Sequence, residues 1–296
     1  MNANAAKILV ATDFSDGADE AIRQADRWAK ETKAGLVACH VVPYFLRSAP
    51  YMTQWQRKDS TDLLELQQRA AEELSRRVVE LTSREEGDFE VFVDSGAPDA
   101  AILKAAKELG ATMIVIGAHG TTGIAGLRLG NVAQRVVSYA HVPVLLARPA
   151  PGAGGVLAAT DLSKASLPVV SVGGEVARQR GTKLTVLHVL DLQTVPGAWF
   201  GPGPLSAKAW GAERGLAEKQ LRDAMEQAGV EGEAKVIEGL SAREIVAEAE
   251  RLGAELVVIA THGRTGLARM ALGSVAKSVI HDAPCSVLIL RRPKTS

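Results

Sequence analysis

Glycines that follow an apolar run are the residues best suited to bind a ligand in this chain. Gly117 and Gly120 come directly after such a run, and Gly130 and Asn131 follow after nine intervening residues. A loop that leads from a strand into a helix presents backbone N–H groups and the positive end of the helix dipole, which together bind anions. The pattern predicts a phosphate site, although a single loop of this kind is more often only a structural turn.

The second half of the chain repeats this loop at the same spacing. Ala260, Gly263, Gly273 and Ser274 take the places of the four residues of the first half. The repetition favours the binding interpretation over the structural one. We also expect Asn131 and Ser274 to cap the helices that follow, where their side chains could reach a phosphate oxygen.

An acidic residue ends the first apolar run of each half. Thr12 and Asp13 follow the first run, and Thr160 and Asp161 follow its repeat. A carboxylate at this position can face the base or the ribose of a ligand. Alternatively Asp13, or the neighbouring Ser15, caps the next helix, which is the more common role for such a residue.

Other residue types give no pattern typical of catalysis or metal binding. The repeated histidines, His40 with His188 and His119 with His262, have no partner at metal-ligand spacing, so we expect structural roles for them. The sequence has no GxxxxGK[ST] motif and no Ser-His-Asp or CxxC arrangement. We therefore predict no catalytic residue and no metal-binding side chain. Binding without rapid turnover is expected, and a slow ATPase or nucleotidyl-transferring enzyme is the alternative.

The chain contains an internal repeat that covers most of its length. Residues 8–16 recur as residues 156–164, at an offset of 148, and residues 115–137 recur as residues 258–280, at an offset of 143. Between the copies, residues 149–155 are rich in Pro and Gly, as in a linker. We predict one domain over residues 1–148 and a second over residues 156–296.

Each copy alternates short apolar runs with amphipathic segments. This alternation predicts parallel strands buried on both faces. The fold class is therefore α/β, with two tandem doubly wound domains, each a five-stranded, mainly parallel sheet with helices on both faces. In the first copy we expect strands over residues 7–11, 35–42, 89–93, 112–116 and 144–148, and helices over residues 18–33, 62–86, 98–109 and from about 131. The second copy is expected to follow the same order.

Composition narrows the range of functions. Lys plus Arg and Asp plus Glu number 34 each, so no net charge attracts nucleic acid or an anionic membrane. The sequence shows no signal peptide and no apolar run of about 20 residues, so we expect a cytoplasmic protein that does not span a membrane. Cys39 and Cys285 both lie in apolar runs and are expected to be reduced core thiols.

Four motifs together resemble the universal stress protein family. They are ATDFS, CHVV, GAHG with its nine-residue gap to GN, and VPVLLAR, and they occur in order along the first copy. The resemblance extends over almost the whole chain, twice. ATP-binding members of the family carry Gly-x2-Gly-x9-Gly-Ser/Thr. This chain departs from that pattern at Asn131, which replaces the hydroxyl residue, and at Ala260, which replaces the first glycine.

The resemblance implies a nucleotide site in each copy. In the first copy, Asp13 and Val41 would lie near adenine, and the loop residues would hold the ribose and phosphates. The implied nucleotide-binding residues are Ala11, Thr12, Asp13, Val41, Gly117, Gly120, Gly130 and Asn131, with their counterparts Ala159, Thr160, Asp161, Val189, Ala260, Gly263, Gly273 and Ser274.

The resemblance also implies the ligand and the assembly. The ligand would be ATP, AMP or ADP, with any Mg²⁺ held mainly by the phosphates, and the role would be regulation in a stress response. Family members often pair through their last strands, so we expect a homodimer or an intrachain pseudo-dimer that uses residues 144–148 and 287–291. Both copies are expected to bind, giving two nucleotides per chain.

Overall fold

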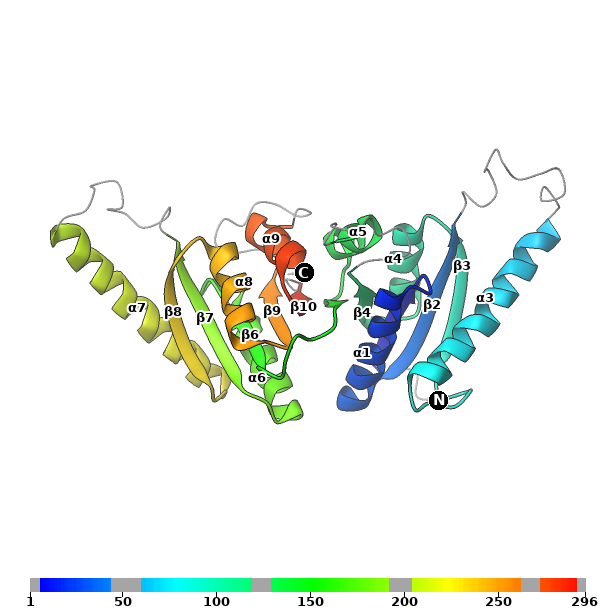
Figure 1. Ribbon diagram of the computed structural model, residues 1–296, viewed down its shortest axis with the longest axis horizontal. Helices are drawn as coiled ribbons and strands as arrows, with labels where there is room; N and C mark the ends of the chain where they lie inside the picture. The colour runs from blue at the N-terminus through cyan, green and yellow to red at the C-terminus, as the bar shows by residue number, and fades with distance from the viewer. Residues whose placement is uncertain (1–5, 44–59, 119–128, 192–203, 262–271, 292–296) are drawn as a thin grey trace. The chain divides into compact units, whose positions relative to one another are not determined.

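The computed structural model describes residues 6–43, 60–118, 129–191, 204–261 and 272–291 (Figure 1). The chain divides into two compact units, Met1–Arg148 and Pro149–Ser296. No helix in the described ranges is long and apolar enough to cross a membrane.

The first unit is built on a parallel sheet of five strands in the order β3-β2-β1-β4-β5. Its strands are β1 (Lys7–Thr12), β2 (Gly35–Pro43), β3 (Glu90–Gly96), β4 (Ala111–Gly117) and β5 (Val144–Ala147). Most side chains of the central strands β1 and β4 are buried, as expected for a parallel sheet covered on both faces.

Four helices cover the first sheet, two on each face. They are α1 (Asp16–Thr32), α3 (Ser60–Leu81), α4 (Pro98–Glu108) and α5 (Asn131–Tyr139). α1 contacts α3 and α4 contacts α5. Right-handed crossovers put the helices that precede β2 and β3 on one face and those that precede β4 and β5 on the other. The α/β, doubly wound fold predicted from the sequence is confirmed.

The second unit repeats this topology with the strand order β8-β7-β6-β9-β10. Its strands are β6 (Val156–Ala159), β7 (Leu184–Asp191), β8 (Glu233–Gly239), β9 (Leu256–Ala260) and β10 (Ser286–Leu290). Its helices are α6 (Leu167–Arg180), α7 (Pro204–Ala228), α8 (Ser241–Leu252) and α9 (Ser274–Asp282). The order of elements is as predicted. However, α6 begins three residues later than the offset of 148 from α1 would place it.

The order of the strands along the chain reverses direction in the sheet between β1 and β4. The chain winds outward from β1 through β2 to β3, and then crosses back to β4 on the other side of β1. The connections that leave the carboxyl ends of β1 and β4 therefore diverge to opposite faces. In doubly wound sheets, ligands bind at such a topological switch point.

Candidate functional site

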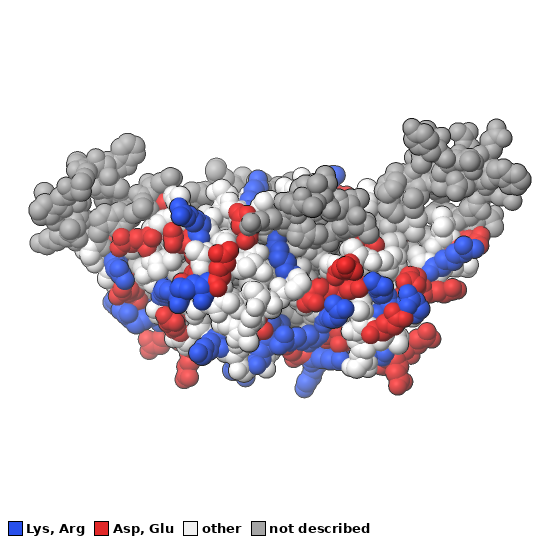
Figure 2. Space-filling view, in the orientation of Figure 1, with Lys and Arg blue, Asp and Glu red and all other residues white. Residues whose placement is uncertain are grey.

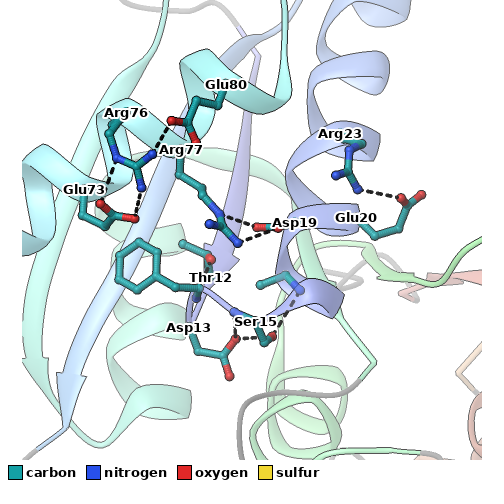
Figure 3. A network of polar contacts seen from close by, with 12 residues as sticks. Thr12, Asp13, Ser15, Asp19, Glu20, Arg23, Glu73, Arg76, Arg77 and Glu80 are labelled. Carbon is teal, nitrogen blue, oxygen red and sulfur yellow. Dashed lines mark hydrogen bonds and ion pairs between the residues drawn. The ribbon is translucent and has the colours of Figure 1, made fainter.

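A tight turn follows β1 and carries Asp13 (Figure 3). The backbone N–H of Phe14 donates to Thr12 Oγ1 over 3.0 Å, and the N–H and hydroxyl of Ser15 donate to Asp13 Oδ1 over 3.2 and 2.5 Å. Phe14 adopts a left-handed backbone conformation, with φ of 63°. Such conformations are unfavourable for residues other than glycine and often occur at functional sites.

Ser15, and not Asp13, caps α1. Its side chain accepts a hydrogen bond from the N–H of Ala18 over 3.3 Å. Asp13 instead holds the capping serine, and its side chain is exposed at the carboxyl edge of the sheet. Of the two alternatives that the sequence left open for the cap, the structure therefore selects Ser15.

Gly117 ends β4 in direct contact with the start of α1. A Cβ added at Gly117 would lie 2.6 Å from the carbonyl oxygen of Gly17, 2.8 Å from its carbonyl carbon and 3.1 Å from the nitrogen of Ala18. Gly117 is not among the described residues with positive φ. A glycine is therefore required at this position because the end of β4 approaches the start of α1 too closely for a side chain. Gly17, which forms the other half of this contact, was missed in the sequence, although a glycine in the first turn of a helix is a signal of such a contact.

The loop after β4 returns to the sheet at Gly130. The N–H of Gly130 donates to the carbonyl of Ala118 over 2.8 Å, which closes the base of the loop. Gly130 is the N-cap of α5 and Asn131 is the first helical residue, so the prediction that Asn131 caps this helix was wrong. The reason is this backbone hydrogen bond, which fixes the extended conformation of the cap position at the glycine. As a glycine, this cap residue makes no side-chain capping bond to α5.

The second unit has the same loop base. The N–H of Gly273 donates to the carbonyl of Thr261 over 2.9 Å. Gly273 is the N-cap of α9, without a side-chain capping bond, and Ser274 is the first helical residue, so the prediction of a Ser274 cap was also wrong. Gly120 and Gly263, together with His119 and His262, lie outside the described residues.

His40 supports the turn after β1. Its Nδ1 donates to the carbonyl of Thr12 over 2.9 Å, and its ring lies 4.5 Å, between centroids, from that of Phe14. Burial lowers the pKa of His40, while the bond to Thr12 and the charge of Asp13 act in the opposite direction. In the second unit, His188 Nδ1 makes the same bond to the carbonyl of Thr160, over 2.8 Å. These contacts agree with the structural role expected for both histidines.

The turn after β6 copies the turn after β1 and adds a serine. The N–H of Leu162 donates to Thr160 Oγ1 over 3.0 Å, and Leu162 has φ of 61°. Asp161 Oδ1 accepts from the N–H and hydroxyl of Ser163 over 3.1 and 2.7 Å, and also from the hydroxyl of Ser166 over 2.5 Å. Ser166 was not recognised in the sequence as a site residue.

Sheet register brings the remaining predicted residues to the same edge. Thr12 pairs with His40, so Val41 follows one residue beyond it, and Ala11 pairs with Ile116, directly before Gly117. In the second unit Ala159 pairs with Leu187, two residues before Val189, and Ala260 ends β9. The structure thus places Ala11, Thr12, Asp13, Val41, Gly117, Gly130 and Asn131 at the carboxyl edge of the first sheet, and Ala159, Thr160, Asp161, Val189, Ala260, Gly273 and Ser274 at that of the second.

An ion pair attaches α3 to the first turn of α1 (Figure 3). Arg77 on α3 forms a bidentate pair with Asp19 on α1, over 2.8 and 2.6 Å. Arg76, one residue before it, pairs with Glu73 and Glu80 on its own helix. The buried carboxylate of Asp19 therefore fixes α3 next to the first turn of α1, which carries the Gly17 contact.

The Cys39 thiol and the metal-ligating side chains are the groups whose chemistry the structure tests in the described residues. Burial, followed by the charge of Asp94, raises the pKa of the Cys39 thiol to about 12, so it stays protonated at neutral pH. No group of three or more metal-ligating side chains is found in the part of the chain that is described. On the face seen in Figure 2, the coloured acidic and basic side chains are interspersed.

Comparison with known proteins gives one family. The model of the universal stress protein family matches residues 5–148 and again residues 154–291. A universal stress protein of Methanocaldococcus jannaschii is 35% identical over 46% of this chain and 80% of its own length. One from Mycobacterium tuberculosis is 26% identical over 97% of both chains.

A solved structure has the same tandem fold. The crystal structure of a universal stress protein from Archaeoglobus fulgidus superposes with a TM-score of 0.66 at 18% identity, covering 97% of this chain and 98% of that one. With a family match in each unit and relatives over the full length, the chain belongs to the universal stress protein family.

Proposed function

We propose that each unit binds an adenine nucleotide at the carboxyl edge of its sheet, and that occupancy regulates a stress response through conformation or partner binding. The observation that carries the proposal is the position of α5. Its N-terminus has a glycine cap and no side-chain capping bond, and it follows directly from the loop that leaves β4 at the topological switch point.

The phosphate end of the site would be formed by this helix N-terminus. The first N–H groups of a helix point along its axis without intrahelical partners, and the helix dipole adds a partial positive charge. A side-chain cap would occupy these donors, and a glycine cap leaves them to an anion. In the second unit, the N-terminus of α9 has the same arrangement, with Gly273 as its cap.

The nucleoside end would be formed by the turn after β1. Asp13 is exposed at this edge, and the bonds from Ser15 fix its Oδ1. A carboxylate is an acceptor, so its partners on a nucleotide are the ribose hydroxyls or the amino group of adenine. Val41 on the neighbouring strand supplies an apolar contact beside it.

Binding without rapid turnover fits the same geometry. Phosphoryl transfer requires a positioned base or cation at the phosphates. Cys39 stays protonated at neutral pH, and the Nδ1 of His40 is engaged within the turn by the carbonyl of Thr12. The protein is therefore proposed as a binding module. A slow ATPase is the second candidate, and it is distinguished by following ADP release.

Calorimetric titration of the nucleotide-free chain with ATP and AMP tests the proposal. We expect saturable binding, weakened about tenfold or more when Asp13→Asn and Asp161→Asn are combined, because a charge-assisted hydrogen bond is lost at each site. Asp88→Asn is the matched control, because Asp88 lies in the turn before β3, at the opposite edge of the sheet. Absence of binding by the unaltered chain overturns the proposal, and ADP release faster than about 1 per second favours the enzyme.

A further inference from the structure

An ion pair joins α4 and α5, the two helices on one face of the first sheet. Nε of Arg135 on α5 lies 2.9 Å from Oδ2 of Asp99 on α4. The side chain of Asp99 is only 12% exposed, and that of Arg135 is 65% exposed. Because the carboxylate is largely removed from water, salt screens this pair less than a pair that is exposed on both sides.

The pair lies at the same edge of the sheet as the candidate site. Asp99 is the second residue of α4, which follows the carboxyl end of β3. Arg135 lies four residues after Asn131, the first residue of α5, which is about 6 Å along the helix axis. The pair is therefore about one helical turn from the N–H groups that would bind a phosphate.

The pair gives α5 a second point of polar attachment. The bond from Gly130 to the carbonyl of Ala118 holds the start of the helix. The inward side of α5 is apolar, with Ala133, Val136 and Val137 buried, and apolar packing is not directional. The ion pair instead joins two specific atoms one turn further along. Two fixed points define an axis, so the pair sets the direction in which the N-terminus of α5 points.

Electrostatics alone would disfavour a carboxylate at this place. Asp99 carries a negative charge near a proposed phosphate site, and like charges repel. The second unit has uncharged residues at both positions, because the repeat places Ala242 at that of Asp99 and Ser278 at that of Arg135. It therefore serves as an internal reference for any change made to the pair.

We propose that Asp99 and Arg135 are positioning residues for the phosphate end of the first nucleotide site. Their ion pair directs α5 so that its N-terminal N–H groups face the ligand. This proposal rests on the proposed function. It makes nucleotide binding by the first unit depend on the pair, and leaves binding by the second unit independent of it.

Titration of the full-length chain with AMP, read by hydrogen exchange and mass spectrometry, tests the proposal. Peptides from α5 and α9 report the occupancy of the two units separately. We expect Asp99→Asn to weaken AMP binding by about threefold to tenfold in the first unit, with the second unit unchanged. An effect of charge alone would have the opposite sign, because the variant removes a negative charge near the phosphate.

Variants of Arg135 test the other half of the pair. Arg135→Gln should weaken AMP binding at least as much as Asp99→Asn, because the positive charge is lost together with the pair. Arg135→Lys can still pair with Asp99 and should keep most of the affinity. In the Arg135→Gln background, Asp99→Asn should cause no further weakening, since no pair remains to be broken. Arg135 is exposed, so its variants keep the test decisive if Asp99→Asn does not fold.

Glu108→Gln is the matched control. It removes one carboxylate from the last residue of α4, about 14 Å along the helix from Asp99. AMP binding by both units should stay the same in this variant.

The outcomes separate this proposal from the proposed function. Unchanged or tighter AMP binding by the first unit in a folded Asp99→Asn or Arg135→Gln would overturn the positioning role and leave the proposed function intact. The same holds for an equal loss in both units, or for Arg135→Lys being as weak as Arg135→Gln. No AMP binding by either unit of the unaltered chain would overturn the proposed function and this proposal together.

Discussion

Gly117 shows that a glycine can be required for space alone. The sequence places it in a Gly-rich loop, where unusual backbone angles are the usual explanation for glycine. In the structure it ends β4 without positive φ, and the backbone of Gly17 occupies the space that a side chain would need. Ala260, in the equivalent position, is likewise not among the described residues with positive φ, so the alanine adds no left-handed backbone strain there.

Gly117→Ala should destabilise the first unit, and with it the nucleotide site proposed there. The added Cβ would meet backbone atoms of Gly17 and Ala18, which can move only with the first turn of α1. We expect a loss of about 1 to 3 kcal/mol in the free energy of unfolding, as for other overpacked sites. Urea denaturation followed by circular dichroism measures it.

Gly35→Ala is the control for this substitution. Gly35 also lies in a strand, β2, but a Cβ there would be 3.7 Å from the nearest atom, Cγ of Lys7, which is an ordinary contact. Its unfolding midpoint should stay close to that of the unaltered chain. A midpoint for Gly117→Ala that matches the control would show that α1 shifts without cost.

Residue types alone predicted which positions lie at the site, and failed on the contacts between them. Thr12 and Asp13 lie at the strand end as predicted. The helix cap was predicted one residue late, at Asn131, because Asn and Gly are both good caps and only the bond from Gly130 to Ala118 decides between them. Gly17 and Gly117 are 100 positions apart, so a glycine in the first turn of a helix can indicate a close contact but not the partner in that contact.

At the scale of elements, the strands were predictable and one helix start was not. Continuous apolar runs identified the buried strands, because parallel strands are covered on both faces. Relative to α1, helix α6 begins three residues later than the repeat offset of 148 would place it. The sequence held a signal in Pro168, which lies in the first turn of α6, where a proline loses no hydrogen bond.

Helix α8 carries a buried carboxylate, Glu248, at a position where the first unit has an alanine. Glu248 is 5% exposed and accepts from Lys235 over 2.8 and 2.9 Å and from Arg251 over 2.6 and 2.9 Å. The repeat places Ala105 at the equivalent position of α4. The bonds from Arg251 hold the pKa of Glu248 below its usual value, with Lys235 acting in the same direction against the effect of burial.

Glu248→Gln should therefore destabilise the second unit in a pH-dependent way. A carboxylate with a lowered pKa in the folded state stabilises the fold above its unfolded pKa of about 4.3, and that contribution is lost as the pH falls through the folded value. We expect the unaltered chain to exceed the variant by about 2 kcal/mol at pH 7, and the difference to shrink below about pH 4. Thermal unfolding at a series of pH values measures it.

Glu250→Gln, on the exposed face of the same helix, serves as the comparison. Its effect should be small at every pH, because an exposed charge is solvated in both states. A Glu248→Gln difference that stays constant from pH 7 to pH 3 would mean that its carboxylate is not linked to folding.

At the scale of the whole molecule, the duplication was readable because both copies keep their motifs at near-constant offsets. The segment between the copies, residues 149–155, makes hydrogen bonds that its composition does not predict. Its Pro and Gly content is typical of a linker. In the structure, the N–H of Gly154 donates to the carbonyl of Gly253 over 2.9 Å, and the N–H of Glu255 donates to the carbonyl of Gly155 over 3.0 Å. Glycine composition cannot distinguish flexibility from close packing.

Gly154→Ala tests whether the two units are independently stable. A Cβ at Gly154 would collide with the carbonyl oxygen of Leu252 and lie 2.6 Å from its carbonyl carbon, at the end of α8. The segment would have to move away, which breaks the bond to Gly253 and disturbs the start of β6. We expect a loss of about 1 to 3 kcal/mol confined to the second unit. Hydrogen exchange read by mass spectrometry should show faster exchange in β6 and α8, with β1 and α1 unchanged.

Gly211→Ala provides the comparison within the same unit, since nothing lies within 4 Å of a Cβ added there on α7. Exchange in β6 and α8 should not increase in that variant, because alanine favours a helix over glycine. Faster exchange of β1 and α1 in Gly154→Ala would show that the units unfold together. Unchanged exchange throughout the chain would show that residues 149–155 act as a passive connection. The expected result, with only the second unit affected, would mean that this segment is a structural part of the second unit. Each proposed nucleotide site would then depend on the stability of its own unit.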